Sequence, residues 1–180
     1  MTKLMMTAAL GLMMSGAAIA QDEQPAGEPS AADPIMQVDT SVFFEQAMSS
    51  NQFEIRSSEM AAEKAEAADI KEFATKMVAD HTKAGEQLQA AAETSDAANP
   101  AAPEPAPKHA AMLKLLEGAQ GADFDALYLD MQAGAHREAV SLFRTYAGSG
   151  DDDAVVAFAE KTLPTLEKHK EHVKELVASK

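Results

Sequence analysis

The sequence predicts an all-α protein, a four-helix bundle built from two antiparallel hairpins and a long crossover that carries a short extra helix. Apolar residues recur every three or four positions through four long segments, which is the spacing of one helix face. The chain is rich in Ala and Met and contains no Trp, a composition typical of helices because such side chains lose little rotamer freedom there. No long run alternates apolar and polar residues, as a strand would require.

Residues 1–20 have the layout of a cleavable secretory signal peptide. Lys3 precedes an uncharged apolar run that ends in the small-x-small sequence Ala18-Ile19-Ala20. Ser15 and Gly16 interrupt this run, which falls short of the ~20 residues that span a bilayer. We expect cleavage after Ala20, a periplasmic or secreted mature protein, and no integral membrane insertion after cleavage.

The rest of the chain is expected to form one domain behind a leader. Residues 21–34 are acidic, rich in Pro and Gly and without large apolar side chains, so a leader over residues 21–38 is expected to be disordered. Residues 39–178 are expected to form the helical domain. Within it, the Pro- and Ala-rich residues 95–107 form an extended connector, because prolines break helices.

The first hairpin is expected to contain helices at about 40–67 and 69–93. Asp39 or Thr40 is placed to cap the first helix and Asp69 the second, because a side-chain oxygen there accepts from free backbone N–H groups. The second helix has an inner face of Ile70, Phe73, Met77, His81, Ala84 and Leu88. The very short connection makes the two helices antiparallel neighbours.

The second hairpin follows a short amphipathic helix at 109–117. Asp123 is placed to cap a helix that runs to about Tyr146, and the sequence Gly148-Ser149-Gly150 predicts a tight turn. Residues 151–153 put negative charge at the start of the last helix, where the helix dipole favours it. That helix runs towards Ala178, with a kink expected at Pro164. Two hairpins joined by a long crossover are the ferritin-like variant of the bundle.

Charge and composition exclude several classes of function. The chain has 15 basic and 29 acidic residues, and signal cleavage removes only Lys3, so a nucleic-acid partner is excluded. No cysteine is present, so any metal must bind to His, Asp or Glu. The sequence contains neither a pattern that indicates a Ser-His-Asp triad nor a glycine-rich nucleotide-binding loop, so hydrolase and nucleotide-binding functions are not expected.

Four ionisable residues fall on the predicted inner faces, one on each long helix: Glu54, His81, His136 and His169. A carboxylate and three neutral imidazoles are a suitable ligand set for iron, manganese, zinc or copper, because these metals accept N and O donors. Counted along the helices from the turn of each hairpin, Glu54 and His81 are expected at the same distance from their turn. His136 and His169 are expected to differ by roughly 9 Å in their distance from theirs. The alternative is a metal-free network of these residues within the core.

Other polar residues are assigned lesser roles. No His follows a Glu at the third position, so the Glu-x-x-His motif of di-iron sites is absent and oxidase chemistry ranks third. His109 is expected to be exposed, and His172 to lie on a solvated surface. Three acids close to the histidines in sequence are candidates for orienting the imidazoles without binding metal themselves; they are Asp80, Asp130 and Glu138.

Four segments resemble the exported bacterial proteins of domain-of-unknown-function family 4142 (DUF4142). The segments are FFEQAMSSNQFEIRSSEMA, IKEFATKMVADH, FDALYLDMQAGAH and FAEKTLPTLEKH, and the resemblance covers residues 42–176. It implies the ferritin-like superfamily and places the recurring acid and histidines of the family on Glu54, His81, His136 and His169. It also places the family tyrosine on Tyr128. No established activity comes with the resemblance.

The function expected from the sequence is that of an exported ferritin-like module that binds a transition metal within the bundle or protects against envelope stress. The alternative is a metal-free structural or interaction protein, whose acidic surface or leader binds an envelope protein. No catalytic residue is assigned. Metal content separates the two hypotheses.

Overall fold

The computed structural model describes residues 37–95 and 104–180, and this part of the chain is helical with no strand. The predicted signal peptide (1–20), most of the predicted leader (21–38) and most of the connector (95–107) lie outside the described residues. The described residues form five helices; they are α1 (Thr40–Lys64), α2 (Ala68–Thr94), α3 (Pro107–Gly118), α4 (Gly121–Ser149) and α5 (Asp153–Ala178).

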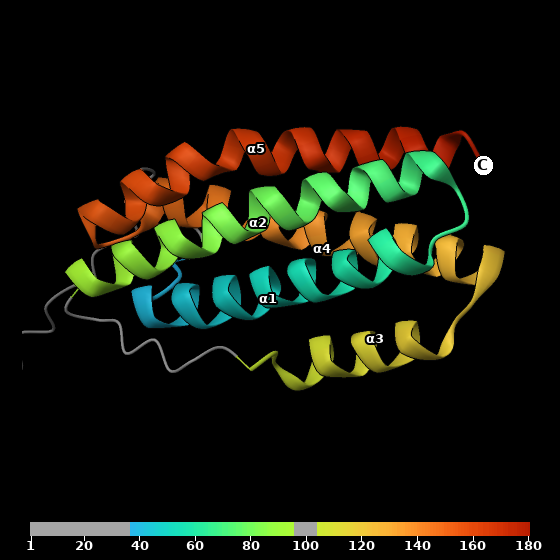
Figure 1. The fold of residues 1–180 in the computed structure, drawn as a ribbon. Coiled ribbons are helices and arrows are strands. Elements are labelled where there is room, and N and C mark those ends of the chain that lie inside the picture. The colour runs from blue at the N-terminus through green and yellow to red at the C-terminus, as the bar shows by residue number, and fades with distance from the viewer. Residues whose placement is uncertain (1–36, 96–103) are drawn as a thin grey trace, which may run out of the picture. The chain divides into compact units, whose positions relative to one another are not determined.

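The four long helices form two antiparallel hairpins, α1–α2 and α4–α5 (Figure 1). Helix α1 packs beside α4 and α2 beside α5, and in each pair the helices run in opposite directions (Figure 1). The short helix α3 packs on α1 and α4 from outside the four. The predicted all-α bundle with two hairpins and a short extra helix is therefore confirmed.

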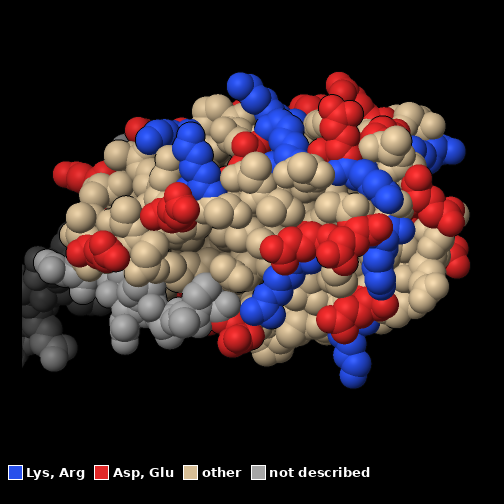
Figure 2. Space-filling view, in the orientation of Figure 1, with Lys and Arg blue, Asp and Glu red and all other residues tan. Residues whose placement is uncertain are grey.

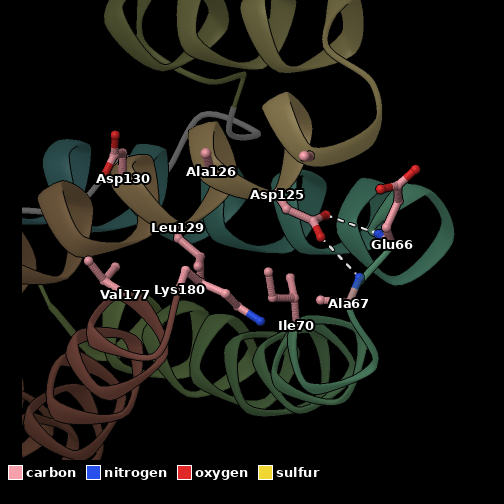
Figure 3. A pocket seen from close by; sticks show the side chains of 10 residues that line it. Glu66, Ala67, Ile70, Asp125, Ala126, Leu129, Asp130, Val177 and Lys180 are labelled. Atoms are coloured by element: carbon pink, nitrogen blue, oxygen red, sulfur yellow. Dashed lines mark hydrogen bonds between the residues drawn. The ribbon is translucent and has the colours of Figure 1, made fainter.

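The caps predicted for two helices are wrong. Helix α2 begins at Ala68 and α4 at Gly121, so Asp69 and Asp123 lie inside the first turns. The α1–α2 turn is held from across the bundle, because the Asp125 carboxylate accepts from the backbone N–H groups of Glu66 (3.1 Å) and Ala67 (3.0 Å). Figure 3 shows these bonds at the edge of a pocket of about 490 Å³ at this end of the bundle. Sequence spacing reveals local caps but not one that comes from another hairpin.

The second turn also differs from the prediction. Helix α4 continues through Gly148 and ends at Ser149, with Gly150 as its C-cap, so the predicted glycine turn is shorter than expected. The side chain of Asp152 caps α5 by accepting from Ala154 and Val155 N–H groups, which agrees with the predicted acidic start of this helix. Pro164 lies inside α5, and the helix continues through it to Ala178.

Two apolar clusters divide the core along the length of the bundle. One cluster contains Phe53 and Met77 and surrounds the α1–α2 turn end, while the other contains Phe143 and Leu166 towards the α4–α5 turn. On α2, α4 and α5 the predicted histidine falls between residues of the first cluster and residues of the second, whereas Glu54 on α1 directly follows Phe53 of the first cluster. The fold therefore places a polar layer between two apolar ones.

The described surface carries both charges. On the face shown in Figure 2, acidic and basic side chains are interspersed and do not gather into a patch of one sign. Within residues 37–95 and 104–180, no helix combines the length and apolarity needed to cross a bilayer.

Candidate metal centre

Three predicted histidines meet in the polar layer, one from each of three helices. His81 comes from α2, His136 from α4 and His169 from α5, and their ring centroids are 5.5–5.7 Å apart. One ring nitrogen from each lies within 4.8 Å of the other two. All three side chains are buried. We refer to these residues as the histidine triad.

The rings of His136 and His169 meet despite the offset expected from the sequence. His136 is 13 residues before the end of α4 and His169 is 16 after the start of α5, so the true offset is about 4.5 Å. In a helix each side chain leans towards the N-terminus. His136 therefore leans away from the α4–α5 turn and His169 leans towards it, and their rings converge.

Each triad ring is fixed through one nitrogen by an oxygen atom outside the triad. His81 Nδ1 lies 3.0 Å from Asn51 Oδ1, and His136 Nδ1 lies 3.0 Å from its own helix's Gln132 carbonyl oxygen. His169 Nε2 lies 2.9 Å from Asp80 Oδ2. Carbonyl and carboxylate oxygens only accept, so these three nitrogens carry the protons and donate.

The remaining nitrogens have no hydrogen-bond partner among the described residues. They are His81 Nε2, His136 Nε2 and His169 Nδ1, and all three are buried. Because the other nitrogen of each neutral ring holds the proton, each of these three carries a lone pair. Burying three such acceptors unpaired is costly, but three convergent lone pairs are what a transition metal needs.

The spacing of these nitrogens fits a metal after small adjustments. A metal with tetrahedral geometry and bonds of about 2.0–2.1 Å to histidine holds its nitrogens about 3.3 Å apart. The triad nitrogens lie within 4.8 Å of one another, so each ring needs to move inward by less than about 1 Å. The outer hydrogen bonds already set the tautomers and orientations, as partners of metal-bound histidines do.

Burial keeps His81 and His169 neutral. It lowers the pKa of His81 well below its ordinary value, and the neighbouring His136 and His169 rings add to this effect. Burial also lowers the pKa of His169 to about 4, although its hydrogen bond to Asp80 opposes the shift. Neutral imidazoles bind metals and protonated ones do not, so these rings are in the binding state at neutral pH.

Glu54, the fourth predicted ligand, lies beside the triad. Its Oε1 is 3.6 Å from His136 Nδ1, the nitrogen that bonds to the Gln132 carbonyl. Burial raises the pKa of this carboxyl, and His136 opposes the rise. The structure thus brings Glu54 next to His136, whereas the partner of His81 on α1 is Asn51.

Two positioning residues were missed by sequence reasoning. Asn51 fixes His81 from α1, and the Gln132 backbone fixes His136 from one turn away in α4. A Cβ at Gly85 would lie only 2.7 Å from Asn51 Nδ2, so the glycine makes room for this amide. The signal for Asn51 is its position three residues before Glu54, on the same helix face.

The other predicted polar residues have different roles. His109 was expected to be exposed, and this is wrong: it is buried against α1, where its Nδ1 lies 2.7 Å from Ser49 Oγ. His172 contacts the Phe73 ring edge-on. Asp80 contacts the triad through His169, whereas Glu138 pairs with Lys108 on α3. Asp130 lines the pocket of Figure 3.

The fold and the site define a class of protein: a helical bundle with a buried cluster of three imidazoles between its two hairpins. The chain belongs to the family of domain of unknown function DUF4142, which it matches over residues 25–176. The resemblance found in the sequence is therefore confirmed.

Among solved structures, the chain is similar to one described as "CopM in the Cu(II)-bound form". The match has a TM-score of 0.65 and 19% sequence identity, and it covers 80% of this chain and 99% of that one. At this identity the likeness shows a shared fold. No curated protein matches the sequence.

Proposed function

We propose that this protein is an exported metal-binding protein that holds one transition-metal ion between His81, His136 and His169. The observation that carries the proposal is the arrangement of the six ring nitrogens. Three are held by oxygen acceptors outside the triad, the other three are buried without partners among the described residues, and one nitrogen from each ring lies within 4.8 Å of the other two. A closed polar network would leave no such convergent set.

The donor chemistry favours copper or zinc among the four metals considered. Three neutral imidazoles suit both metals, whereas manganese prefers carboxylate and water ligands. Similarity to a structure of a protein in a Cu(II)-bound form supports copper as the first metal to test. A bound ion would supply positive charge that satisfies all three lone pairs at once.

In this proposal Glu54 interacts with His136 and does not bind the metal itself. Its carboxyl lies near His136 Nδ1, the outer nitrogen of that ring. A negative carboxylate there would stabilise the N–H of His136 and offset part of the charge of a bound cation. The expected export rests on the signal-like residues 1–20 and would deliver the protein to the periplasm or beyond.

The test is elemental analysis of protein purified without chelators, followed by thermal unfolding with and without added Cu(II) or Zn(II). We expect about one metal per chain and a higher Tm with metal, since a ligand at 100 times its Kd stabilises by about 2.7 kcal/mol. His81→Ala should lose both effects, while His172→Gln should keep them. No metal and no shift in the unaltered protein would favour the metal-free interaction module.

A further inference from the structure

The surroundings of the triad are closed on most sides. Along the bundle axis, Met77 and Val173 belong to the apolar cluster on one side of the polar layer, and Leu88 and Leu166 belong to the cluster on the other. Asn51 and Glu54 cover the layer from α1, and both are buried. An ion therefore has no polar route along the axis or past α1.

One triad contact reaches the surface. The side chain of Asp80 is 31% exposed, whereas that of Glu54 is 2% exposed. Asp80 lies on α2, and its Oδ2 accepts from His169 Nε2 on the neighbouring helix α5. The same oxygen accepts from the Lys76 ammonium, one turn earlier on α2. A single carboxylate thus links solvent, a surface cation and the buried site.

We propose that a metal cation reaches the triad between α2 and α5 past Asp80, and that the Lys76–Asp80 ion pair closes this route. This inference rests on the proposed function and names how access to the same site is controlled. Asp80 is the first carboxylate that an incoming cation meets beside the triad. Lys76 occupies that carboxylate until the cation displaces it.

The Lys76–Asp80 ion pair is weak enough to open when a cation arrives. An exposed ion pair between residues four apart in a helix stabilises a protein only weakly, so opening it costs little. A free carboxylate attracts a cation and raises its local concentration, and an ammonium beside it does the opposite. Entry should therefore depend on these two charges more than the final affinity does.

The experiment measures association of Cu(II) with the metal-free full chain by stopped-flow quenching of tyrosine fluorescence, since the protein contains Tyr and no Trp. The variants are Asp80→Asn, in which the amide oxygen can still accept from His169, and Lys76→Gln. Matched controls on the same helix are Glu72→Gln and Lys71→Gln, which make the same charge changes at exposed positions.

We expect Asp80→Asn to slow association by about tenfold and Lys76→Gln to speed it severalfold, with both controls within twofold of the unaltered protein. For Lys76→Gln, dissociation should speed up by the same factor, leaving Kd within twofold.

Unchanged association rates in both variants would overturn the entry route while leaving the metal site intact. So would an effect of Asp80→Asn confined to dissociation, which marks a purely positioning role. Absence of any Cu(II) binding to the unaltered protein would instead remove the proposed function, and the entry route with it.

Discussion

His109 and the histidine triad are two ways to bury an imidazole in one bundle. His109 on α3 bonds through Nδ1 to Ser49 Oγ and stacks on Phe53, with ring centroids 5.3 Å apart. The triad rings are also fixed through one nitrogen each, but their other nitrogens have no partner among the described residues, and one nitrogen from each ring lies within 4.8 Å of the other two. Burial alone is therefore not the mark of a metal site. The mark is the convergence of free lone pairs.

The difference follows from where each residue sits. His109 belongs to an outer helix, and Ser49 Oγ, which it contacts, also accepts from the Ala106 N–H at the start of α3. This pair fastens α3 to α1. The triad belongs to three helices of the bundle itself, in the layer between the apolar clusters. One arrangement ties two elements together, and the other leaves a centre to be filled.

The comparison is tested most strongly by matched substitutions in the two places. His136→Gln removes one of three proposed donors and should weaken Cu(II) binding by more than about a hundredfold, beyond the 10- to 100-fold cost of losing an outer partner. His109→Gln should leave affinity within twofold. Equilibrium competition against a chelator of known affinity measures both. Equal losses in the two variants would mean that the triad is not the site.

The second test is the pH dependence of stability in metal-free protein. Burial lowers the pKa of His169 to about 4, while an unfolded histidine has a pKa near 6.5. The unfolded chain binds more protons between these values, so stability is complete above about pH 6.5 and is lost as pH falls towards 4. For His169 this loss is on the order of 3 kcal/mol.

Urea unfolding at pH 7, 5.5 and 4.5 measures this effect. In His169→Gln the unfolding free energy should fall much less as the pH is lowered. The part of the fall that comes from His81 should remain. The pKa of His109 is also lowered by burial, so His109→Gln should flatten it as well, but less. A decline that is unaffected by His169→Gln would contradict a neutral buried ring at this position.

Much of this arrangement could be predicted from the sequence. Helical spacing placed His81, His136 and His169 on inner faces, and the short turns paired their helices. The meeting of His136 with His169 could not be predicted, because it depends on where α4 ends, where α5 begins and how the side chains lean. The partner Asn51 was not predicted. Asp80 was a candidate for orienting an imidazole, but its place beside His81 in the sequence did not reveal that it bonds to His169 on another helix.

His109 shows the opposite failure. It follows the proline-rich connector and Lys108, which suggested that its side chain is exposed at the start of the short helix. The structure begins α3 at Pro107, a favoured first helical position, and this turns His109 towards α1. Local composition could not reveal that contact, because the partner Ser49 lies 60 residues earlier.

A third test concerns the support of the triad by α1. Gly85→Ala places a Cβ only 2.7 Å from Asn51 Nδ2, which is closer than van der Waals contact allows. The Asn51 amide that fixes His81 must therefore move. We expect about a tenfold loss of Cu(II) affinity. Gly134→Ala on α4 is the matched control, because its Cβ meets nothing within 4 Å.

The control should keep full affinity and gain about 0.5–1 kcal/mol of stability, because alanine favours a helix over glycine. Isothermal titration and urea unfolding measure the two quantities. If Gly85→Ala bound Cu(II) as tightly as the control, Asn51 would have no part in orienting the site.

The smallest expected effect is the loss of stability when the contact between Ser49 and His109 is removed. Ser49→Ala leaves both His109 Nδ1 and the Ala106 N–H without their partner, and should cost about 1 kcal/mol of unfolding free energy. Metal affinity should not change, because Ser49 does not contact the triad residues. A drop in affinity in this variant would show that α3 and the triad are coupled, against the separation of the two regions.

The central claim is tested most directly by anomalous diffraction at the copper absorption edge from crystals of Cu(II)-loaded protein. The account predicts one strong peak within about 2.0–2.1 Å of His81 Nε2, His136 Nε2 and His169 Nδ1. A peak at His109, His172 or surface carboxylates, with none between the three buried rings, would contradict it.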